Sequence, residues 1–200
     1  MNLHELFGEI DIYLFDQLLK GRFATNMSIL DAGCGGGRNL IYFLRNGYEV
    51  HGVDQNAEAV AQVRHLASIF NPSLQKENFL VSSVEVMPFP SERFDVVISS
   101  AVLHFARDEQ HFNKMLNEMW RVLKPEGLFF ARLASSIGIE KLVKPIEGRR
   151  YLLPDGSECF LVDAEMLISA TKKLGAEWVE PIKTTNVQNL RCMTTWVLRK

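Results

Sequence analysis

The 200-residue chain has few cysteines, almost no excess charge and no long apolar run. Its three cysteines are odd in number, lie far apart and lack metal-ligand spacing, which argues against a disulfide framework and gives no reason to expect a bound metal. Sparse cysteines of this kind are typical of a reducing compartment. They are Cys34, Cys159 and Cys192.

Neither sign of charge dominates, since 22 lysines and arginines stand against 24 acidic residues, a net charge of −2. The chain therefore lacks the basic footprint of a protein that binds nucleic acid or an anionic membrane. No stretch approaches the ~18 apolar residues of a membrane span, and the first residues lack the basic and apolar segments of a signal peptide. We expect a cytoplasmic protein that binds neither nucleic acid nor membrane.

The apolar residues, 47% of the chain, follow a regular pattern. Short apolar runs alternate with segments of helical periodicity, which is typical of a parallel sheet covered by helices on both faces. The pattern predicts helices over 38–46, 56–69, 109–123 and 163–174, after an amphipathic helix or pair of helices over 3–23. It predicts strands over 28–31, 49–53, 78–82, 94–99, 128–132, 177–183 and 191–199.

These elements predict an α/β fold, a Rossmann-like, doubly wound sheet of seven mostly parallel strands. The last strand is expected to be antiparallel, because only a short polar connection over 184–190 separates the final two. We expect 1–200 to form one domain, with a helical cap over 1–25, an insertion or lid loop over 135–160, and a helix and antiparallel strand pair over 161–200. The loop is expected because charges, prolines and glycines fill that segment.

The most informative segment lies directly after the first predicted strand, where four glycines fall within five residues. It reads Asp31-Ala32-Gly33-Cys34-Gly35-Gly36-Gly37-Arg38-Asn39. Glycines at a strand-to-helix turn let a ligand approach backbone N–H groups closely. The dinucleotide fingerprint G-x-G-x-x-G fails, because Arg38 stands where its third glycine belongs. An acid two residues before the first glycine repels a pyrophosphate and suits a ligand that carries an ammonium group.

A second acid, Asp54, closes the second predicted strand and is followed by Gln55. An acid at this place can bond both ribose hydroxyls of an adenosine. Dehydrogenases use the same device, so Asp54 indicates an adenosine ligand without separating the two enzyme classes. The alternative is that Asp54 caps the helix predicted to start at Asn56.

Together these motifs resemble those of class I S-adenosylmethionine-dependent methyltransferases. The segment Asp31 to Gly37 resembles their first motif, D-x-G-x-G-x-G. Ser83-Val84-Glu85-Val86-Met87-Pro88-Phe89 resembles their D-A-E-x-L-P-F, and Arg121-Val122-Leu123-Lys124-Pro125-Glu126-Gly127 resembles their R-x-L-K-P-G-G. The resemblance covers about half of the chain, and we expect 28–134 to be a cofactor-binding core.

The resemblance implies S-adenosylmethionine as cofactor and S-adenosylhomocysteine as product. Asp31 would accept from the ammonium group of the methionine part, and the turn would wrap the methionine and ribose. The turn residues concerned are Gly33, Gly35 and Gly37. Ser83 stands where the family has an acid that bonds the adenine amino group, and Val84 would offer its backbone to the ring edge. Glu85 is expected either to supply that acid or to cap the next turn.

The resemblance also places the methyl group beside the segment that follows the fourth predicted strand and begins at Ser99. His104 in this segment is a candidate general base, with packing or capping as the alternative role. Tyr13 is a candidate to cap the methionine carboxylate. The other four histidines lie within a strand or on helical faces and receive no role: His4, His51, His65 and His111.

We therefore predict transfer of a methyl group to a small-molecule acceptor by in-line displacement. The sequence leaves two alternatives. The chain could bind the cofactor without turnover, as a sensor or partner subunit, or it could be a nicotinamide-dependent oxidoreductase, against the glycine spacing. The sequence leaves open the acceptor and its accepting atom, the need for a general base, the role of 135–160 and the oligomeric state.

Overall fold

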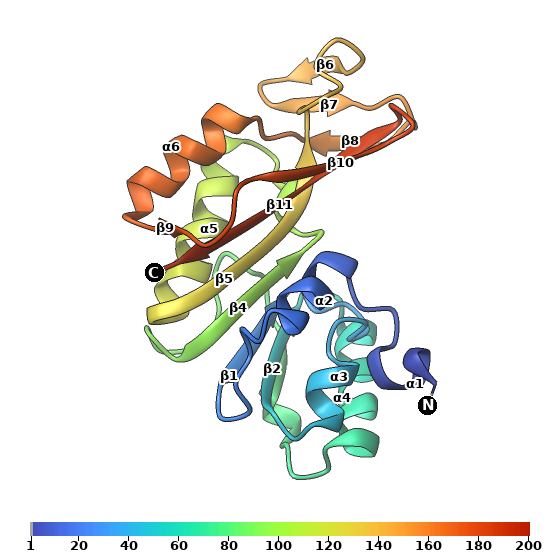
Figure 1. Ribbon diagram of the computed structural model, residues 1–200, viewed down its shortest axis with the longest axis vertical. Coiled ribbons are helices and arrows are strands. Elements are labelled where there is room, and N and C mark those ends of the chain that lie inside the picture. The colour runs from blue at the N-terminus through green and yellow to red at the C-terminus, as the bar shows by residue number, and fades with distance from the viewer. Residues whose placement is uncertain (1) are drawn as a thin grey trace.

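The computed structural model describes residues 2–200 and contains one large sheet between two layers of helices (Figure 1). The sheet order is β10-β11-β5-β4-β1-β2-β3, and β9 pairs with β11. The parallel strands of its first part are β1 (Ser28–Ala32), β2 (Glu49–Asp54), β3 (Phe79–Val81), β4 (Phe94–Ser100) and β5 (Leu123–Ser135). The antiparallel part consists of β9 (Glu177–Trp178), β10 (Lys183–Val187) and β11 (Arg191–Arg199).

This arrangement confirms the predicted doubly wound, mostly parallel sheet, with β11 antiparallel to β5. The sheet has eight strands where seven were predicted. The prediction of a single strand over 177–183 was wrong, because β9 ends at Trp178 and β10 starts at Lys183. Pro181 lies in this gap and has no N–H to donate to a strand ladder, which explains the interruption.

Helices cover both faces of the sheet. Figure 1 shows α3 (Ile41–Arg45) and α4 (Ala57–Phe70) on one side, and α5 (Glu109–Val122) and α6 (Ala164–Leu174) on the other. Neighbouring strand residues point to opposite faces of the sheet. Ile29 therefore belongs to the core beneath α3 and α4, and Leu30 to the core beneath α5 and α6. Across 2–200, no helix combines the length and the apolar character needed to cross a membrane.

The N-terminal segment forms two helices, α1 (Leu3–Phe7) and α2 (Ile12–Leu19). Gly8 ends α1 with a φ of 58°, and the Asp11 side chain begins α2 by accepting from the Tyr13 N–H. The Phe7 ring stacks on Tyr42 of α3, with their centroids 5.2 Å apart. Of the two options left by the periodicity, the pair of helices is the correct one.

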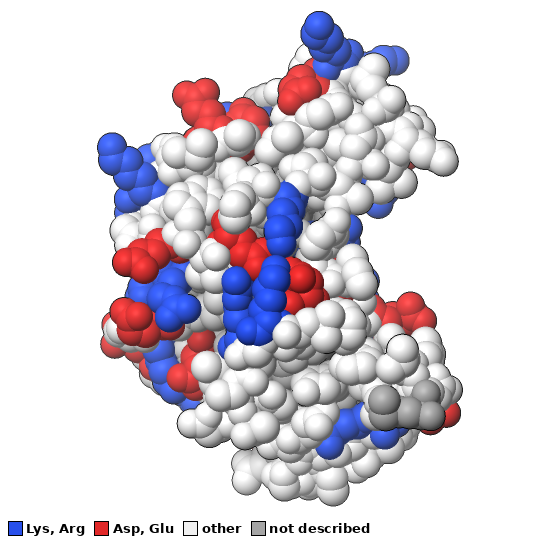
Figure 2. Space-filling model, in the orientation of Figure 1, with Lys and Arg blue, Asp and Glu red and all other residues white. Residues whose placement is uncertain are grey.

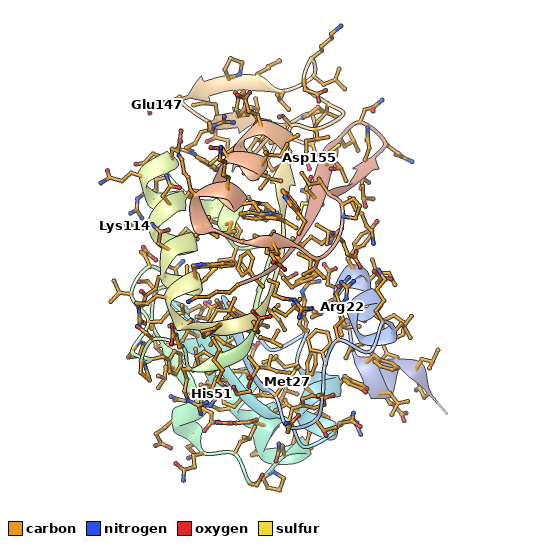
Figure 3. The ribbon with its side chains drawn as sticks, turned by 60° about the vertical axis from the view of Figure 1, so that its left-hand side comes forward. Arg22, Met27, His51, Lys114, Glu147 and Asp155 are labelled. Carbon is orange, nitrogen blue, oxygen red and sulfur yellow. The ribbon has the colours of Figure 1, made fainter. Side chains whose placement is uncertain are left out.

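The segment 135–160 differs from the predicted loop, because it contains a second, three-stranded antiparallel sheet. Its strands are β6 (Lys144–Glu147), β7 (Arg150–Leu152) and β8 (Glu158–Phe160). Gly148 forms the turn between β6 and β7 with a φ of 54°, and Leu153 and Leu161 pack against Ala134 beneath them. The strands are short and interrupted by turn residues, which hid their periodicity. Figure 3 shows Glu147 at the end of this small sheet that lies away from the main sheet.

Candidate functional site

A pocket of about 580 Å³ opens at the carboxyl ends of the central parallel strands. Its walls come from the glycine turn after β1, the end of β2, the segments after β3 and β4, and the first turns of α5. This is where doubly wound sheets bind their ligands, because the helices after neighbouring strands leave a crevice at the point where strand order reverses. Its size suits a small organic ligand.

Asp31 is not a lining residue of the pocket but lies near the end of β1, two residues before Gly33, which does line it. Its carboxyl group is in an unusual electrostatic state. Its residue is 1% exposed, and within residues 2–200 neither carboxylate oxygen has a hydrogen-bond partner. Burial raises the pKa of Asp31 to about 8; the Arg38 guanidinium lowers it and the Asp54 carboxylate raises it further. A buried carboxylate without a partner is unfavourable for folding, so its presence beside a pocket indicates a ligand that provides the partner.

Strand pairing fixes the position of Asp31. It lies opposite Gly52 of β2 on one side and Ile98 of β4 on the other. A Cβ atom at Gly52 would lie 3.0 Å from the Cys34 Sγ, so the glycine leaves room for the Cys34 side chain of the turn after β1. Burial also raises the pKa of Cys34, which keeps this pocket-lining thiol protonated and unreactive.

The glycine turn runs close to the segment after β4. Gly33 has a φ of 87°, and a Cβ there would lie 2.4 Å from Val102 Cγ2, so no larger residue fits. Gly35 lines the pocket, and an added Cβ there would have no atom of residues 2–200 within 4 Å. Gly37 lies away from the pocket and packs toward Val63 of α4. Of the three predicted glycines, Gly33 and Gly35 thus line the pocket, while Gly37 allows the turn to pack closely against α4.

Asp54 ends β2 and lines the pocket with Gln55. Its Oδ2 accepts from the Gly35 N–H at 2.9 Å, and its Oδ1 accepts from the Asn56 N–H at 2.9 Å. The capping role considered for Asp54 belongs to Asn56, whose side chain accepts from the Glu58 and Ala59 N–H groups. Asp54 is therefore held at the pocket by the glycine turn itself.

The three residues expected at the adenine, Ser83, Val84 and Glu85, all line the pocket. Glu85 pairs with His111 of α5, with 3.0 Å between Glu85 Oε1 and His111 Nε2. His111 received no role from the sequence, because the helical pattern does not show whether a residue on the helix surface faces the pocket. The available signal was its place in the first turn of the helix after strand four, next to the carboxyl edge of the sheet.

Five of the predicted residues do not line the pocket: Asp31 and Gly37, which are described above, and Ser99, His104 and Tyr13. Ser99 is fully buried beneath it, and the neighbouring Ser100 lines the wall instead. His104 is buried, and its Nδ1 accepts from the Ala134 N–H at 3.3 Å. Burial, with the Arg191 charge, lowers the pKa of His104 to about 4. The neighbouring Phe105 lines the pocket, so His104 packs behind that wall, as in the alternative role considered for it.

Tyr13 also lies outside the pocket. Its hydroxyl bonds Thr185 Oγ1 at 2.5 Å, and the Arg132 guanidinium lies 5.3 Å from its ring centroid. The cationic groups that do line the pocket are Arg38 and Arg107, and Arg38 donates to the Ser100 hydroxyl at 3.2 Å. Arg38 lies 3.9 Å from the carboxylate of the buried Asp11, which anchors the N-terminal helices at this rim.

The pocket offers acids, amides and two guanidinium groups. Among the residues that the structure describes, no group of three histidine, cysteine, aspartate or glutamate side chains could hold a metal ion. The arrangement combines an acceptor for a cation in Asp31, a further acceptor in Asp54 and a donor for an anion in Arg38. These groups suit a ligand that carries an ammonium group, hydroxyl groups and a carboxylate.

Comparison with known proteins agrees with this reading of the site. Residues 30–131 match the family model described as a methyltransferase domain. The uncharacterized methyltransferase YodH of Bacillus subtilis is 31% identical over 155 residues, covering 74% of this chain and 59% of YodH. The mitochondrial ubiquinone biosynthesis O-methyltransferase of Mus musculus is 34% identical over 176 residues, covering 72% of this chain and 46% of that enzyme. The chain thus spans about half the length of these relatives.

Solved structures share the fold at low sequence identity. A methyltransferase from Methanosarcina mazei superposes with a TM-score of 0.71 at 20% identity, covering 92% of this chain and 96% of that one. The Burkholderia thailandensis 1,6-didemethyltoxoflavin-N1-methyltransferase, solved with S-adenosylhomocysteine, gives a TM-score of 0.72 at 19% identity. That alignment covers 97% of this chain and 79% of the other. Both alignments cover more than nine-tenths of this chain, so the likeness in fold is not confined to residues 30–131.

Proposed function

Since this chain belongs to the methyltransferase domain family of S-adenosylmethionine-dependent enzymes, we propose that it transfers a methyl group from that cofactor to a small-molecule acceptor. The observation that carries the proposal is the buried Asp31 carboxylate, which lacks a partner in residues 2–200 and lies beside a glycine-lined pocket. The methionine part of the cofactor has an ammonium group that would supply this partner in a charge-assisted hydrogen bond.

The other polar groups of the pocket fit the remaining parts of the cofactor. Asp54 is available for the ribose hydroxyls, because the Gly35 and Asn56 N–H groups hold its carboxylate in place without enclosing it. Gln55 lies beside it on the same wall. Ser83 and Val84 offer a hydroxyl and backbone groups to the adenine.

Arg38 is the group that we assign to the methionine carboxylate. It lines the pocket with its side chain half exposed, and its charge acts on Asp31, as the Asp31 pKa shows. A carboxylate and a guanidinium near one another suit the two charges of an amino acid. Tyr13 was the sequence-based candidate for this role, but its hydroxyl is directed to Thr185.

S-adenosylmethionine supplies a methyl group on a positively charged sulfur, and this charge disappears as the methyl group leaves. The chain's own contribution is alignment and exclusion of water. Val102, Phe105 and Met115 provide apolar surface in the pocket, which lowers the local polarity. His104 points to Ala134 and the His111 ring nitrogens face Arg107 and Glu85, so neither imidazole is free to act as a base. We infer an acceptor atom that does not have to lose a proton to a histidine before it attacks the methyl group.

A small-molecule acceptor is supported by the size of the pocket, about 580 Å³, and by the balanced surface charge. Figure 2 shows basic and acidic residues intermixed on the visible face, without a basic groove. The name of one similar protein refers to the biosynthesis of ubiquinone, and that of another to 1,6-didemethyltoxoflavin. Both compounds are small molecules. A cytoplasmic location remains our prediction from the sparse cysteines.

Titration calorimetry with S-adenosylmethionine, S-adenosylhomocysteine and NAD tests the cofactor assignment. We expect micromolar binding of the first two compounds and none of NAD. Binding of NAD alone would contradict the proposal. A second assay, release of S-adenosylhomocysteine in the presence of a panel of small nucleophiles, separates an enzyme from a protein that binds the cofactor without turnover.

A further inference from the structure

The segment after β4 leaves an aromatic ring and a cation uncovered at the wall of the pocket. Phe105 is 69% exposed, Arg107 is also exposed, and both line the pocket. Phe105 ends the short helix η2 (Leu103–Phe105), and Arg107 directly precedes Asp108, the N-cap of α5. The family resemblance places the transferred methyl group beside this segment. Both side chains therefore belong to the wall at which a methyl acceptor is expected.

The Arg107 backbone is fixed, while its guanidinium is unpaired. Its backbone N–H donates to the Nδ1 atom of His111 at 3.1 Å, which holds it against the first turn of α5. The guanidinium makes no hydrogen bond or ion pair with any other residue that the structure describes. Arg38, in contrast, donates to Ser100 and lies 3.9 Å from the Asp11 carboxylate. Arg107 is therefore the guanidinium left for an anionic group of a ligand.

The acids at the pocket are poor acceptors for a proton from a substrate. Burial raises the pKa of Glu85, but hydrogen bonds from its own backbone, from His111 and from Ser83 lower it below its usual range. Each oxygen of Asp54 accepts a backbone N–H at 2.9 Å. Asp31 is assigned to the ammonium group of the cofactor. With neither imidazole at the pocket free, the acceptor has to arrive with its lone pair available.

A carboxylate meets this requirement at neutral pH. Carboxyl groups have ordinary pKa values of about 4, whereas thiols, phenols and alkyl amines titrate at about 8.5 to 10.4 and arrive mostly protonated. An uncharged ring nitrogen also has a lone pair, but it offers no charge to Arg107. The negative charge of a carboxylate is attracted by the guanidinium and by the positive sulfur of the cofactor. Charges that cancel during the transfer are favoured by a pocket of low polarity.

We propose that the methyl acceptor is a small apolar carboxylic acid, with its carboxylate bound by Arg107 and its apolar part against Phe105. This rests on the proposed function, because it names the acceptor class of the same site. One carboxylate oxygen donates a lone pair to the methyl carbon, while the carbon–sulfur bond breaks and its electron pair stays on sulfur. The other oxygen stays on Arg107. The products are a methyl ester and S-adenosylhomocysteine, and no proton is transferred.

The first test measures binding without turnover, in the complex with S-adenosylhomocysteine. The probes are cinnamate, indole-3-acetate and octanoate, each compared with its uncharged carboxamide by titration calorimetry. We expect at least one acid to bind more tightly than its amide by about tenfold or more, as for a hydrogen bond to a charged group. Arg107→Gln should reduce the affinity for that acid to that of the amide. Arg107→Lys, which keeps the charge, should restore part of it.

Two further sets of variants separate charge from apolar contact. Arg199→Gln is the matched control, because Arg199 is an exposed arginine of β11 whose register partner is Leu128, far from the carboxyl end of β5. It should leave every Kd unchanged. Phe105→Ala should weaken acids and amides alike severalfold, and Phe105→Leu should do so less, because leucine keeps apolar surface. The substituted side chains are exposed, and circular dichroism checks that the variants fold.

The second test follows the methyl group itself. With methyl-tritiated S-adenosylmethionine, a methyl ester releases tritiated methanol in alkali, whereas methyl groups on nitrogen, sulfur or an ether oxygen are retained. We expect alkali-labile label from the acid that binds and none from its amide. In Arg107→Gln, kcat/KM for this acid should fall about tenfold, mainly through KM.

The outcomes separate the acceptor class from the proposed function. Equal binding of acids and amides, no binding of any acid, or an unchanged acid affinity in Arg107→Gln overturns the acidic acceptor. Unchanged affinities in Phe105→Ala overturn the role of Phe105. Label that is stable to alkali, or an acid that binds without accepting label, overturns the carboxylate as the accepting group. In all these cases S-adenosylhomocysteine is still bound, whereas a chain that does not bind it contradicts the proposed function itself.

Discussion

Two buried acids in this molecule have opposite surroundings. Asp31, at the carboxyl end of β1, is 1% exposed and has no hydrogen-bond partner anywhere in 2–200. Glu180, between β9 and β10, is 9% exposed and contacts Lys20 at 2.5 Å, Lys183 at 2.5 Å and Arg22 at 2.9 Å. Burial raises the pKa of both carboxyls, and for Asp31 it reaches about 8. For Glu180 the bonds from Lys183 and Lys20 and the Arg22 charge prevail, so its pKa falls to about 2.

The difference separates a site that completes the fold from a site left for a ligand. Lys20 ends α2, Arg22 follows it, and Lys183 begins β10, so Glu180 ties the N-terminal helices to the antiparallel end of the sheet. Figure 2 shows acidic and basic residues side by side in the middle of this face, and Figure 3 shows Arg22 beside α2. Asp31 receives no such partner from the chain, which is expected if its partner is the cofactor.

The largest effect is expected from Asp31→Asn. Removing the charge should weaken S-adenosylhomocysteine binding by about 100-fold or more, because a buried ammonium group would lose its counter-ion. The same variant should stabilise the free protein, since it removes an unpaired buried carboxylate. Calorimetry and thermal melting measure the two effects. A variant that loses both affinity and stability would show that Asp31 has a structural role.

The pH dependence sharpens the same comparison. The folded-state pKa of Asp31 lies above its unfolded value of 3.8, so the folded protein binds the extra proton between pH 4 and about 8. Stability of the free protein should therefore fall as pH rises through this range, by about 1.4 kcal/mol per unit of pKa difference at most. Cofactor affinity should rise over the same range, because binding needs the ionised form. Urea unfolding and calorimetry at several pH values measure both slopes. If both slopes persist in Asp31→Asn, they come from another group.

Asp54→Ala should have an intermediate effect. The loss of charged hydrogen bonds to the ribose should weaken cofactor binding by about 1–3 kcal/mol. Asp54 differs from Asp31 in having partners within the chain, so its removal should also destabilise the free protein slightly, by freeing the Gly35 and Asn56 N–H groups. Calorimetry and melting report the two quantities. Unchanged cofactor affinity would contradict the role given to the end of β2.

The smallest effect on binding is expected from Glu180→Gln. It should lower the free energy of unfolding by about 1–3 kcal/mol, because three cations lose a shielded partner. Cofactor affinity should stay unchanged. The depressed pKa of Glu180 means that its contribution is present above pH 4.5 and is lost as pH falls toward 2. Urea unfolding at pH 7 and pH 3 measures this. A large loss of cofactor affinity would show that the N-terminal helices reach the cofactor through this cluster.

Several features followed from the sequence because they depend on local chemistry. The strand-to-helix turn at Asp31 to Gly37 requires glycines wherever it occurs, and Asp54 ends a run of apolar strand residues. The helix bounds at α4 and α5 agree with prediction within one residue, since their caps at Asn56 and Asp108 are local signals. The small sheet of β6, β7 and β8 was missed because three- and four-residue strands carry too little periodicity.

The sequence by itself determined the doubly wound sheet, the family and the acids at the ends of β1 and β2, because strand alternation, glycine turns and strand-end residues are set within a few positions of the chain. Only the tertiary structure decided which side chains reach the pocket. His104 and His111 both follow β4, yet one packs behind Phe105 and the other lines the wall with Glu85. That outcome depends on how η2 (Leu103–Phe105) and α5 pack against the sheet, through contacts between residues distant in sequence.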